Sequence, residues 1–448
     1  MSFSAKDILQ MQVAPALGCT EPVAVALGAA AAASLLPGRT IDSIDSIEIL
    51  LDPNIYKNGL AVIIPGTHGM IGLDTASILG ALGGDPALGL EVLADIDDDT
   101  VAGAKTFLEH KGVAVNLREE SGLYVHTTIK SAGDIAESLI VRRHNNIVEL
   151  RLNGIIQKGS PLLKELNDGT TVSRHQQLED WLKQRRLEDL VALIEGLDAE
   201  DLQFIEEGIQ CNLKLAAYGL KYGTGLGIGK ALERMLRQKL LTRDMSMTAK
   251  ILTSAAADAR MGGARLPAMS SAGSGNHGLT ATLPIWAIKD FIDHDHETVL
   301  RAVGLSHIVT AYVKAHIGTL SAVCGCSVAA GAGAAAGITY LIGGDAGHMA
   351  GAIKNISEDL TGIICDGAKA GCAIKLNTAA GAAVQAALFS LQGVSVQDTD
   401  GIIGDGPEST VRNMGIISTE GMVATDKTII KIMREKQQLK TGKSKRDL

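Results

Sequence analysis

Aromatic residues are scarce in this sequence: they make up 3% of its 448 residues, whereas glycine occurs 51 times. Few large rings are therefore present to fill the interior, and an interior of alanine and glycine indicates tightly packed helices whose backbones approach closely. Cysteine is scarce too, because six cysteines are too few for a disulfide framework in a chain of this length. We therefore expect reduced cysteines that bind a metal or take part in chemistry.

Basic charge is also lacking. The formal net charge is -9 and the isoelectric point is near 5.7, whereas a domain that binds nucleic acid is expected to be basic. We therefore expect no nucleic-acid partner. The exception is the basic segment at residues 433–448, which we expect to be a solvated, disordered end rather than a binding arm.

Long hydrophobic runs suited to a membrane are missing as well, because a span needs about 20 mostly apolar residues. Residues 22–36 are too few, and residues 324–344 are mainly alanine and glycine. Such residues contribute little transfer free energy but let helices approach closely. We expect buried helices, no membrane partner and a cytoplasmic location.

Several catalytic motifs are absent. The sequence has no G-x-S-x-G elbow, no dinucleotide-binding glycine fingerprint and no H-E-x-x-H. Hydrolase, dehydrogenase and zinc-protease functions therefore lose their usual support.

The hydrophobic pattern predicts an α+β fold. An Ala/Gly-rich helical core domain carries the cysteine loops, and a smaller α+β domain holds a largely antiparallel sheet. The expected parts are N-terminal helices packed on the helical core (1–40), the α+β domain (41–155), a charged helical connector (156–207) and the helical core (208–432).

Two short segments of the smaller domain illustrate the pattern. Residues 61–66, AVIIPG, are expected to form a strand. Residues 53–59, PNIYKNG, are expected to form a polar loop, in which Asn54, Lys57 and Asn58 either shape a turn or contact a ligand. The residues themselves leave both roles open.

Four of the six cysteines lie within residues 321–377. Cys324 and Cys326 precede Cys365 and Cys372 by about forty residues, and their spacings match neither structural zinc pairs nor the ferredoxin run. Thiolates on separated glycine-rich loops suit a soft metal, and three of them would leave one metal position open to substrate. The alternative is that they are buried core cysteines.

A fifth cysteine, Cys19, lies in the loop ALGCTEP. Thr20 is expected to be the N-cap of the helix that follows, with Pro22 near its first position. Cys19 would then lie at a helix N-terminus, where backbone N–H groups and the helix dipole lower a thiol pKa and favour anions.

The loop GSGNHG, residues 273–278, contains Ser274, Asn276 and His277. It lacks the spacing and the downstream lysine of a phosphate-binding P-loop. Its backbone and polar side chains could instead bind a carboxylate or an ammonium group.

A further candidate group lies in SHIVTAYVKAHIG, where His307 and Lys314 share a helix face and His316 lies well round from Lys314. Any one of the three could be a general base or a substrate clamp.

Four motifs together, ALGCTEPVAVALGAAAA, SSAGSGNHGLTA, LSAVCGCSVAAGAGAAAGI and ICDGAKAGCAIKLN, resemble one known family. The chain is similar over nearly its full length to the L-cysteine desulfidases of the UPF0597 group, which are related to the iron–sulfur L-serine dehydratase alpha chain. The gap between the last two cysteines is shorter than in the dehydratases, and the GCTEP loop replaces their serine-rich loop.

The resemblance implies a [4Fe-4S] cluster held by three cysteines, which supports non-redox α,β-elimination from a small amino acid. Cys365 and Cys372 match the dehydratase ligands. Cys324 is the best third match, with Cys326 as its competitor, and Cys19 is either a ligand or a catalytic residue. L-Cysteine would give sulfide, pyruvate and ammonia.

Two alternatives remain open: L-serine or L-threonine as the substrate of the same cluster, or a non-catalytic metal-binding protein that retains the fold. We expect a homodimer, and we expect the N-terminal loop to fold back onto the helical core. We predict catalytic roles for Cys19, Lys314 and His307, and substrate-binding roles for Thr20, Glu21, Ser274, Asn276 and His277.

Overall fold

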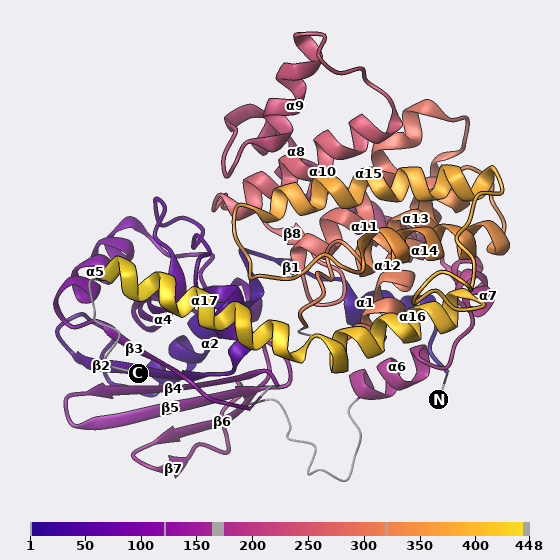
Figure 1. Cartoon of the computed structure of the whole chain (residues 1–448). Coiled ribbons are helices and arrows are strands. Elements are labelled where there is room, and N and C mark those ends of the chain that lie inside the picture. Colours follow the sequence, from indigo (N-terminus) through magenta and orange to yellow (C-terminus); the bar gives the residue numbers. More distant parts are fainter. Residues whose placement is uncertain (1, 121, 164–173, 319–320, 442–448) are drawn as a thin grey trace.

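The computed structural model describes residues 2–120, 122–163, 174–318 and 321–441. Figure 1 shows a sheet with its helices in one part of the molecule and a bundle of helices in the other. The fold is α+β, as the sequence predicted.

The main sheet has six strands in the order β3-β2-β4-β5-β6-β7. Strands β2 and β3 are parallel, and every other neighbouring pair is antiparallel. Burial alternates along β4, as expected when one face packs against helices. The strands are β2 (Ile44–Leu51), β3 (Val113–Leu117), β4 (Tyr124–Ser131), β5 (Asp134–Val141), β6 (Ile147–Leu152) and β7 (Ile155–Ile156).

Helix α2 (Thr20–Ala33) packs on this sheet. We expected both N-terminal helices to pack on the helical core, and for α2 that expectation is wrong. The physical reason is its surface of alanine and glycine: a Cβ added at Gly28 would lie 3.0 Å from Thr127 Oγ1, and Ser138 Oγ donates to Gly28 O at 2.7 Å. Only a helix without large side chains can lie this close to a sheet. Helices α4 (Gly72–Gly83) and α5 (Asp98–His110) complete this layer.

The segment before α2 belongs to the helical part. Helix α1 (Ala5–Gln12) buries its apolar face in the main helical core. Strand β1 (Pro15–Ala16) then pairs antiparallel with β8 (Ala268–Met269). The chain therefore crosses from the bundle to the sheet within the loop that carries Cys19.

The helical part is built from Ala-rich helices joined by Gly-rich loops, as expected, although α8 begins nine residues before the predicted boundary at 208. The connector helices are α6 (Arg174–Leu182) and α7 (Leu187–Leu193). The bundle comprises α8 (Ala199–Tyr222), α9 (Ile228–Arg237), α10 (Met245–Met261), α11 (Gly275–Ile288), α12 (His296–Ile317), α13 (Ala329–Leu341), α14 (Ala346–Leu360), α15 (Cys372–Leu391) and α16 (Pro407–Ile416).

Helices α8 and α10 make one of the closest contacts in the bundle. A Cβ added at Gly219 would lie 1.9 Å from Ala255 O. We expect Gly219→Ala to destabilise the protein by about 1–3 kcal/mol, because overpacking outweighs the gain of about 1 kcal/mol that alanine brings to a helix interior. Thermal or denaturant unfolding measures this change.

Gly196→Ala is the matched control, since a Cβ there would meet nothing within 4 Å. Its stability should stay within about 0.5 kcal/mol of the parent protein. If Gly219→Ala were as stable as this control, the close contact between the two helices would be wrong.

The last described helix, α17 (Val423–Thr441), runs from the bundle across to the sheet part (Figure 1). We expected residues 433–448 to be disordered, but the helix continues through the first part of that segment. The reason is its apolar side: Ile430 packs in the same core cluster as the sheet. Residues 442–448 lie outside the described residues.

By length and composition, α15 is the one described helix that could cross a membrane, with a mean hydropathy of 1.2. More than half of it, 56%, is buried, and it packs against α10, α13 and α14. Core helices of this kind pass the same test, so the expected absence of a membrane partner stays a prediction.

Residues 53–59, expected to be a loop, form helix α3 (Pro53–Gly59) instead. The side chain of Asp52 caps it by accepting from the Asn54 N–H at 2.9 Å, and Pro53 occupies the first helical position. An acidic N-cap followed by proline is a helix-start signal that outweighed the polar composition of the segment.

Residues 61–66, expected to be a strand, lie outside the sheet. Ile63 forms only an isolated bridge with Ile71. Gly66 has a φ of +77°, and this turn ends the extended run. A short apolar run cannot by itself be told apart from a buried loop.

Candidate active site

The two loops that carry the cysteines lie side by side. The Cys324 N–H donates to Ile363 O at 2.8 Å. In return, the Cys365 N–H donates to Ala322 O at 2.6 Å, and an antiparallel bridge joins the same two segments. Segments about forty residues apart in the sequence therefore present their cysteines from one shared backbone frame.

The thiols of Cys324, Cys365 and Cys372 lie close enough to affect one another's ionisation. Burial, together with the neighbouring Cys324, raises the pKa of the Cys372 thiol to about 12. Burial and Cys324 also raise the pKa of Cys365. The fold thus brings the three cysteines that match the family ligands to one place, and their role as ligands stays a prediction.

Cys324 and Cys326 interact directly. A hydrogen bond from the Cys326 thiol lowers the pKa of Cys324 to about 5, and the same contact raises the pKa of Cys326. The Ser327 hydroxyl also donates to Cys324 Sγ at 3.5 Å. Negative charge is therefore better stabilised on Cys324, the one that the sequence favours as the third ligand.

No group of three or more His, Cys, Asp or Glu side chains within the described residues is arranged to hold a single metal ion. A polynuclear cluster differs from a single ion because each thiolate binds a different metal atom, so the sulfurs lie farther apart. The soft, buried thiols fit a cluster of this kind better than a mononuclear zinc site.

Several lysines lie around the thiols, among them Lys57, Lys314, Lys369 and Lys375. Lys57 Nζ pairs with Asp426 Oδ1 at 2.6 Å, and Lys375 Nζ donates to Asp366 Oδ1 at 2.5 Å. Lys314 lies on α12, and its Nζ makes no hydrogen bond or ion pair with any described residue. Burial lowers its pKa, while the thiolates of the cysteine loops act in the opposite direction. The positive charges would stabilise several thiolates in one site.

Helix α3 reaches the thiols through Lys57 and Asn58. The Cys365 thiol donates to Asn58 Oδ1 at 3.8 Å, and Asn58 Nδ2 donates to Glu21 Oε1 at 3.1 Å. A Cβ added at Gly367 would lie 2.3 Å from Lys57 O, so only glycine fits where the Cys365 loop meets helix α3. The sequence left turn and ligand contact open for these residues, and the structure places both at the site.

Cys19 joins the site from the N-terminal loop. It is buried, belongs to the same apolar cluster as Cys372, and has Cys326 packed against that cluster. The loop therefore folds back onto the helical core, as expected. Burial raises the pKa of the Cys19 thiol to about 11, although Arg260 acts against this. The expected lowering by the helix N-terminus is wrong because desolvation dominates.

The predicted N-cap of α2 is also off by one residue: Cys19 occupies the N-cap position and Thr20 begins the helix. Thr20 Oγ1 donates to Glu21 Oε2 at 3.1 Å. The same carboxylate accepts from Asn58, so both predicted substrate-binding residues lie beside the thiol site.

His277 faces the cysteine loop. Its Nδ1 lies 3.0 Å from Ser271 O and 3.3 Å from Ala272 O, so Nδ1 carries the proton and Nε2 keeps its lone pair. Burial, followed by the nearby Lys314, lowers the pKa of His277 to about 3. A Cβ added at Gly325 would lie 2.6 Å from His277 Nε2 and 3.3 Å from Lys314 Nζ. Because Gly325 has no side chain, the neutral imidazole of His277 and the amine of Lys314 can both lie against the CGC loop.

His307 contacts Ser271, the same residue whose backbone carbonyl accepts from His277. Its Nδ1 lies 2.9 Å from Ser271 Oγ, and burial alone lowers its pKa to about 4. Lys314, about two turns further along the same face of α12, interacts with the thiols, whereas His307 does not. Ser274 joins the same turn, since the Ser274 N–H donates to Ser271 O at 3.1 Å. His307 and Ser274 thus shape the loop that holds His277.

Three helices begin at this site: α2 after Cys19, α11 after Ser274 and α15 after Gly371. None of the three has a side-chain hydrogen bond at its N-cap. The dipoles of these helices add positive potential, which favours thiolates and other anions.

Residues 90–431 match the family model described as "Serine dehydratase alpha chain". This match covers more than half of the chain. The chain belongs to the serine dehydratase alpha chain family.

Named relatives support the same assignment over nearly the whole length. A UPF0597 protein of Desulfotalea psychrophila is 66% identical, covering 97% of this chain and 99% of its own. One of Desulfatibacillum aliphaticivorans is 58% identical over 98% of this chain and 99% of its own. One of Clostridioides difficile is 39% identical over 96% and 99%. These names state no activity, and they confirm the predicted UPF0597 group within the serine dehydratase alpha chain family.

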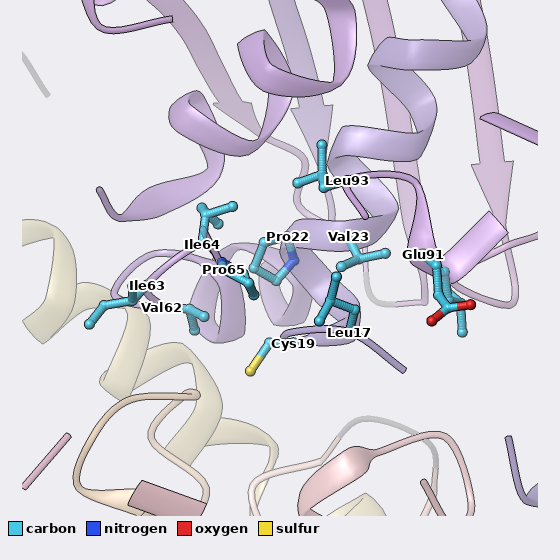
Figure 2. A pocket seen from close by; sticks show the side chains of 11 residues that line it. Leu17, Cys19, Pro22, Val23, Val62, Ile63, Ile64, Pro65, Glu91 and Leu93 are labelled. Atoms are coloured by element: carbon cyan, nitrogen blue, oxygen red, sulfur yellow. The ribbon is translucent and has the colours of Figure 1, made fainter. Parts of the chain in front are cut away.

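Beside the site of this serine dehydratase alpha chain family member lies a small apolar pocket. It encloses about 10 Å³, room for roughly one water molecule, so it does not itself fit an amino acid. Cys19 stands at its edge, and Figure 2 shows the sulfur pointing away from Leu93. The other lining residues are Leu17, Pro22, Val23, Val62, Ile63, Ile64, Pro65, Leu90 and Glu91.

Sequence reasoning missed a buried arginine and a partly buried histidine near the site. Arg260, on α10, contacts the loops of both Cys19 and Asn276. His144, in the β5–β6 turn, has a buried Nε2 without a described partner, and Glu21 influences its ionisation. Neither lies in a motif with a recognisable spacing, although an arginine within an otherwise Ala-rich helix is a usable signal.

Proposed function

We propose that this protein catalyses non-redox α,β-elimination of L-cysteine to sulfide and aminoacrylate, which hydrolyses to pyruvate and ammonia. The observation that carries the proposal is the convergence of four separate motifs on one buried site. The loops of Cys19, His277, Cys324 and Cys365 meet there, although they span most of the sequence.

The residues fit an iron–sulfur cluster of the kind that the family implies. Cys324, Cys365 and Cys372 would hold it, because their thiols are soft, buried and mutually close. When bound with three thiolates, such a cluster supplies a Lewis acid that stabilises a leaving sulfur or oxygen. Lys57, Lys375 and Lys314 offset the negative charge of the thiolates.

Proton transfer can be assigned to groups of the chain itself. The reaction needs a base for the α-proton, and Lys314 carries a partly buried amine whose Nζ has no hydrogen-bond partner among the described residues. Burial lowers its pKa and so increases its neutral, proton-accepting fraction. Neutral His277 beside it is the alternative acceptor.

Glu21 would bind the substrate's ammonium group. Its carboxylate lies at the start of α2, held by Thr20 and by Asn58, which also contacts Cys365. An ammonium placed there would lie near the cysteine loops.

L-Serine or L-threonine is the second candidate substrate, favoured by the family to which the chain belongs. Elimination from either would use the same cysteines and the same base, with water as the leaving group. Cys19, in the loop that replaces the serine-rich loop of the dehydratases, favours L-cysteine.

A side-by-side assay tests the proposal. Anaerobically reconstituted protein with a full iron and sulfide count should release sulfide and pyruvate from L-cysteine faster than pyruvate from L-serine or 2-oxobutanoate from L-threonine. Turnover of L-serine alone would make the protein a dehydratase. A fully loaded protein that leaves every amino acid untouched would instead be a non-catalytic metal-binding protein.

A further inference from the structure

Arg260 lies near the C-terminal end of α10 and is 3% exposed. Its Nη2 donates to Gly18 O at 2.6 Å, and its Nη1 donates to Asn276 Oδ1 at 2.9 Å. One guanidinium therefore joins the GCTEP loop to the GSGNHG loop, two motifs about 250 residues apart.

These two hydrogen bonds do not use all the N–H donors of the Arg260 guanidinium. Its Nε–H is buried and has no partner within the residues that the structure describes. No described carboxylate forms an ion pair with it, although a buried charge is costly unless it is paired. Lys57 and Lys375 differ because they have acidic partners, whereas the ionisable side chain that Arg260 contacts is the Cys19 thiol.

The surroundings of Arg260 favour an anion. Helices α2 and α11 begin beside it, at Cys19 and Ser274, and neither has a side-chain hydrogen bond at its N-cap. A Cβ added at Gly275 would lie 2.5 Å from Arg260 Nε and 2.7 Å from Cζ, so the glycine backbone packs against the guanidinium and holds it in place. Free N–H donors from a fixed guanidinium and two helix ends suit a planar carboxylate.

We propose that Arg260 binds the α-carboxylate of the amino-acid substrate. The inference rests on the proposed function for the identity of the substrate, but a carboxylate is what the chemistry of the site itself selects. Arg260 also influences Cys19 and His277, so a carboxylate held there would lie between the Cys19 loop and the GSGNHG loop.

A binding experiment tests this without turnover. L-Alanine has the carboxylate and ammonium but no leaving group, and L-alaninamide lacks the carboxylate charge. Calorimetry on the full chain should show wild-type protein binding L-alanine at least tenfold more tightly than L-alaninamide. Arg260→Gln should lose that preference, and Arg260→Lys should keep only part of it, because lysine cannot donate in a bidentate manner.

Arg265→Gln is the matched control. Arg265 is exposed and donates to the backbone of Ala94 and Ile96, away from the site, so this variant should keep the preference. Equal binding of the two probes by wild-type protein, or an unchanged preference in Arg260→Gln, would overturn the proposal. The wild-type comparison tests the preference for a carboxylate even if Arg260→Gln does not fold, and Arg260→Lys, which keeps the charge, then tests the arginine itself.

Kinetics separate this inference from the proposed function. With L-cysteine, Arg260→Lys should raise KM at least tenfold and lower kcat less, as expected when binding of the substrate is weakened. A protein that binds L-alanine through Arg260 but turns over no amino acid would refute the proposed reaction alone. Normal turnover by Arg260→Gln with an unchanged KM would refute the role of Arg260 alone.

Discussion

Cys365→Ala and Cys372→Ala should each abolish the visible absorption of anaerobically reconstituted protein and reduce elimination to the background rate. Each substitution removes one of three thiolates that the fold brings together, and a cluster with two protein ligands is poorly held. Absorption spectra, iron counts and sulfide release measure the effect. Normal absorption in either variant would remove that cysteine from the ligand set.

Cys211→Ala is the matched control. Cys211 lies on α8, and its thiol donates to Pro267 O at 3.1 Å, outside the cysteine loops. Its replacement should leave absorption and activity unchanged.

The same series of alanine variants tests the roles of Cys324, Cys326 and Cys19. Cys324→Ala should behave like Cys365→Ala, whereas Cys326→Ala should keep its absorption, because negative charge is better stabilised on Cys324. Cys19→Ala has two informative outcomes. Retained absorption with lost activity would mean a catalytic role, and lost absorption would mean a ligand.

Lys314→Met should lower kcat by about 10²–10⁴-fold while leaving the absorption unchanged, since this is the usual contribution of a general base. Methionine fills a similar volume but cannot accept a proton. The amine of Lys314 is partly buried next to the thiols and His277, and it has no hydrogen-bond partner among the described residues. Steady-state kinetics with L-cysteine measure the loss.

Two further variants make this result interpretable. Lys314→Arg keeps a positive charge but cannot deprotonate near neutral pH, so it should restore activity only if the residue is a clamp rather than a base. Lys105→Met, on the exposed side of α5, should keep full activity. An unchanged kcat in Lys314→Met would exclude the lysine from the catalytic machinery.

The sequence indicated correctly which loops would meet. The unusual spacing of Cys324, Cys326, Cys365 and Cys372 in glycine-rich loops predicted one shared site, and backbone bonds join the loops of Cys324 and Cys365. The return of Cys19 onto the helical core was also predicted, and Cys19 shares a packed cluster with Cys372. Such motifs can be recognised because cysteine is rare in this chain, so four cysteines in one short segment stand out.

Other features depended on long-range packing and were missed or misplaced. We predicted that helix α2 packs in the bundle. Its surface of alanine and glycine can fit closely against either helices or a sheet, so the sequence does not distinguish the two, and α2 packs on the sheet. The roles of Lys57 and Asn58, to shape a turn or to contact a ligand, stayed open because a polar segment of seven residues does not reveal which groups it contacts in the folded chain. The pKa of Cys19 was expected to fall, but the depth of its burial cannot be read from a helix-start motif.

By itself, the sequence determined the α+β class, the family and the set of cysteine loops, because these depend on local periodicity and on rare residues in fixed motifs. Only the tertiary structure decided which charged groups share the site. In the sequence, Arg260 lies in no recognisable motif. In the folded chain it donates hydrogen bonds to Gly18 O and to Asn276 Oδ1, and so joins the two loops. Whether two charged groups interact strongly depends on a separation of a few ångströms in the folded chain, and positions in the sequence do not give this separation.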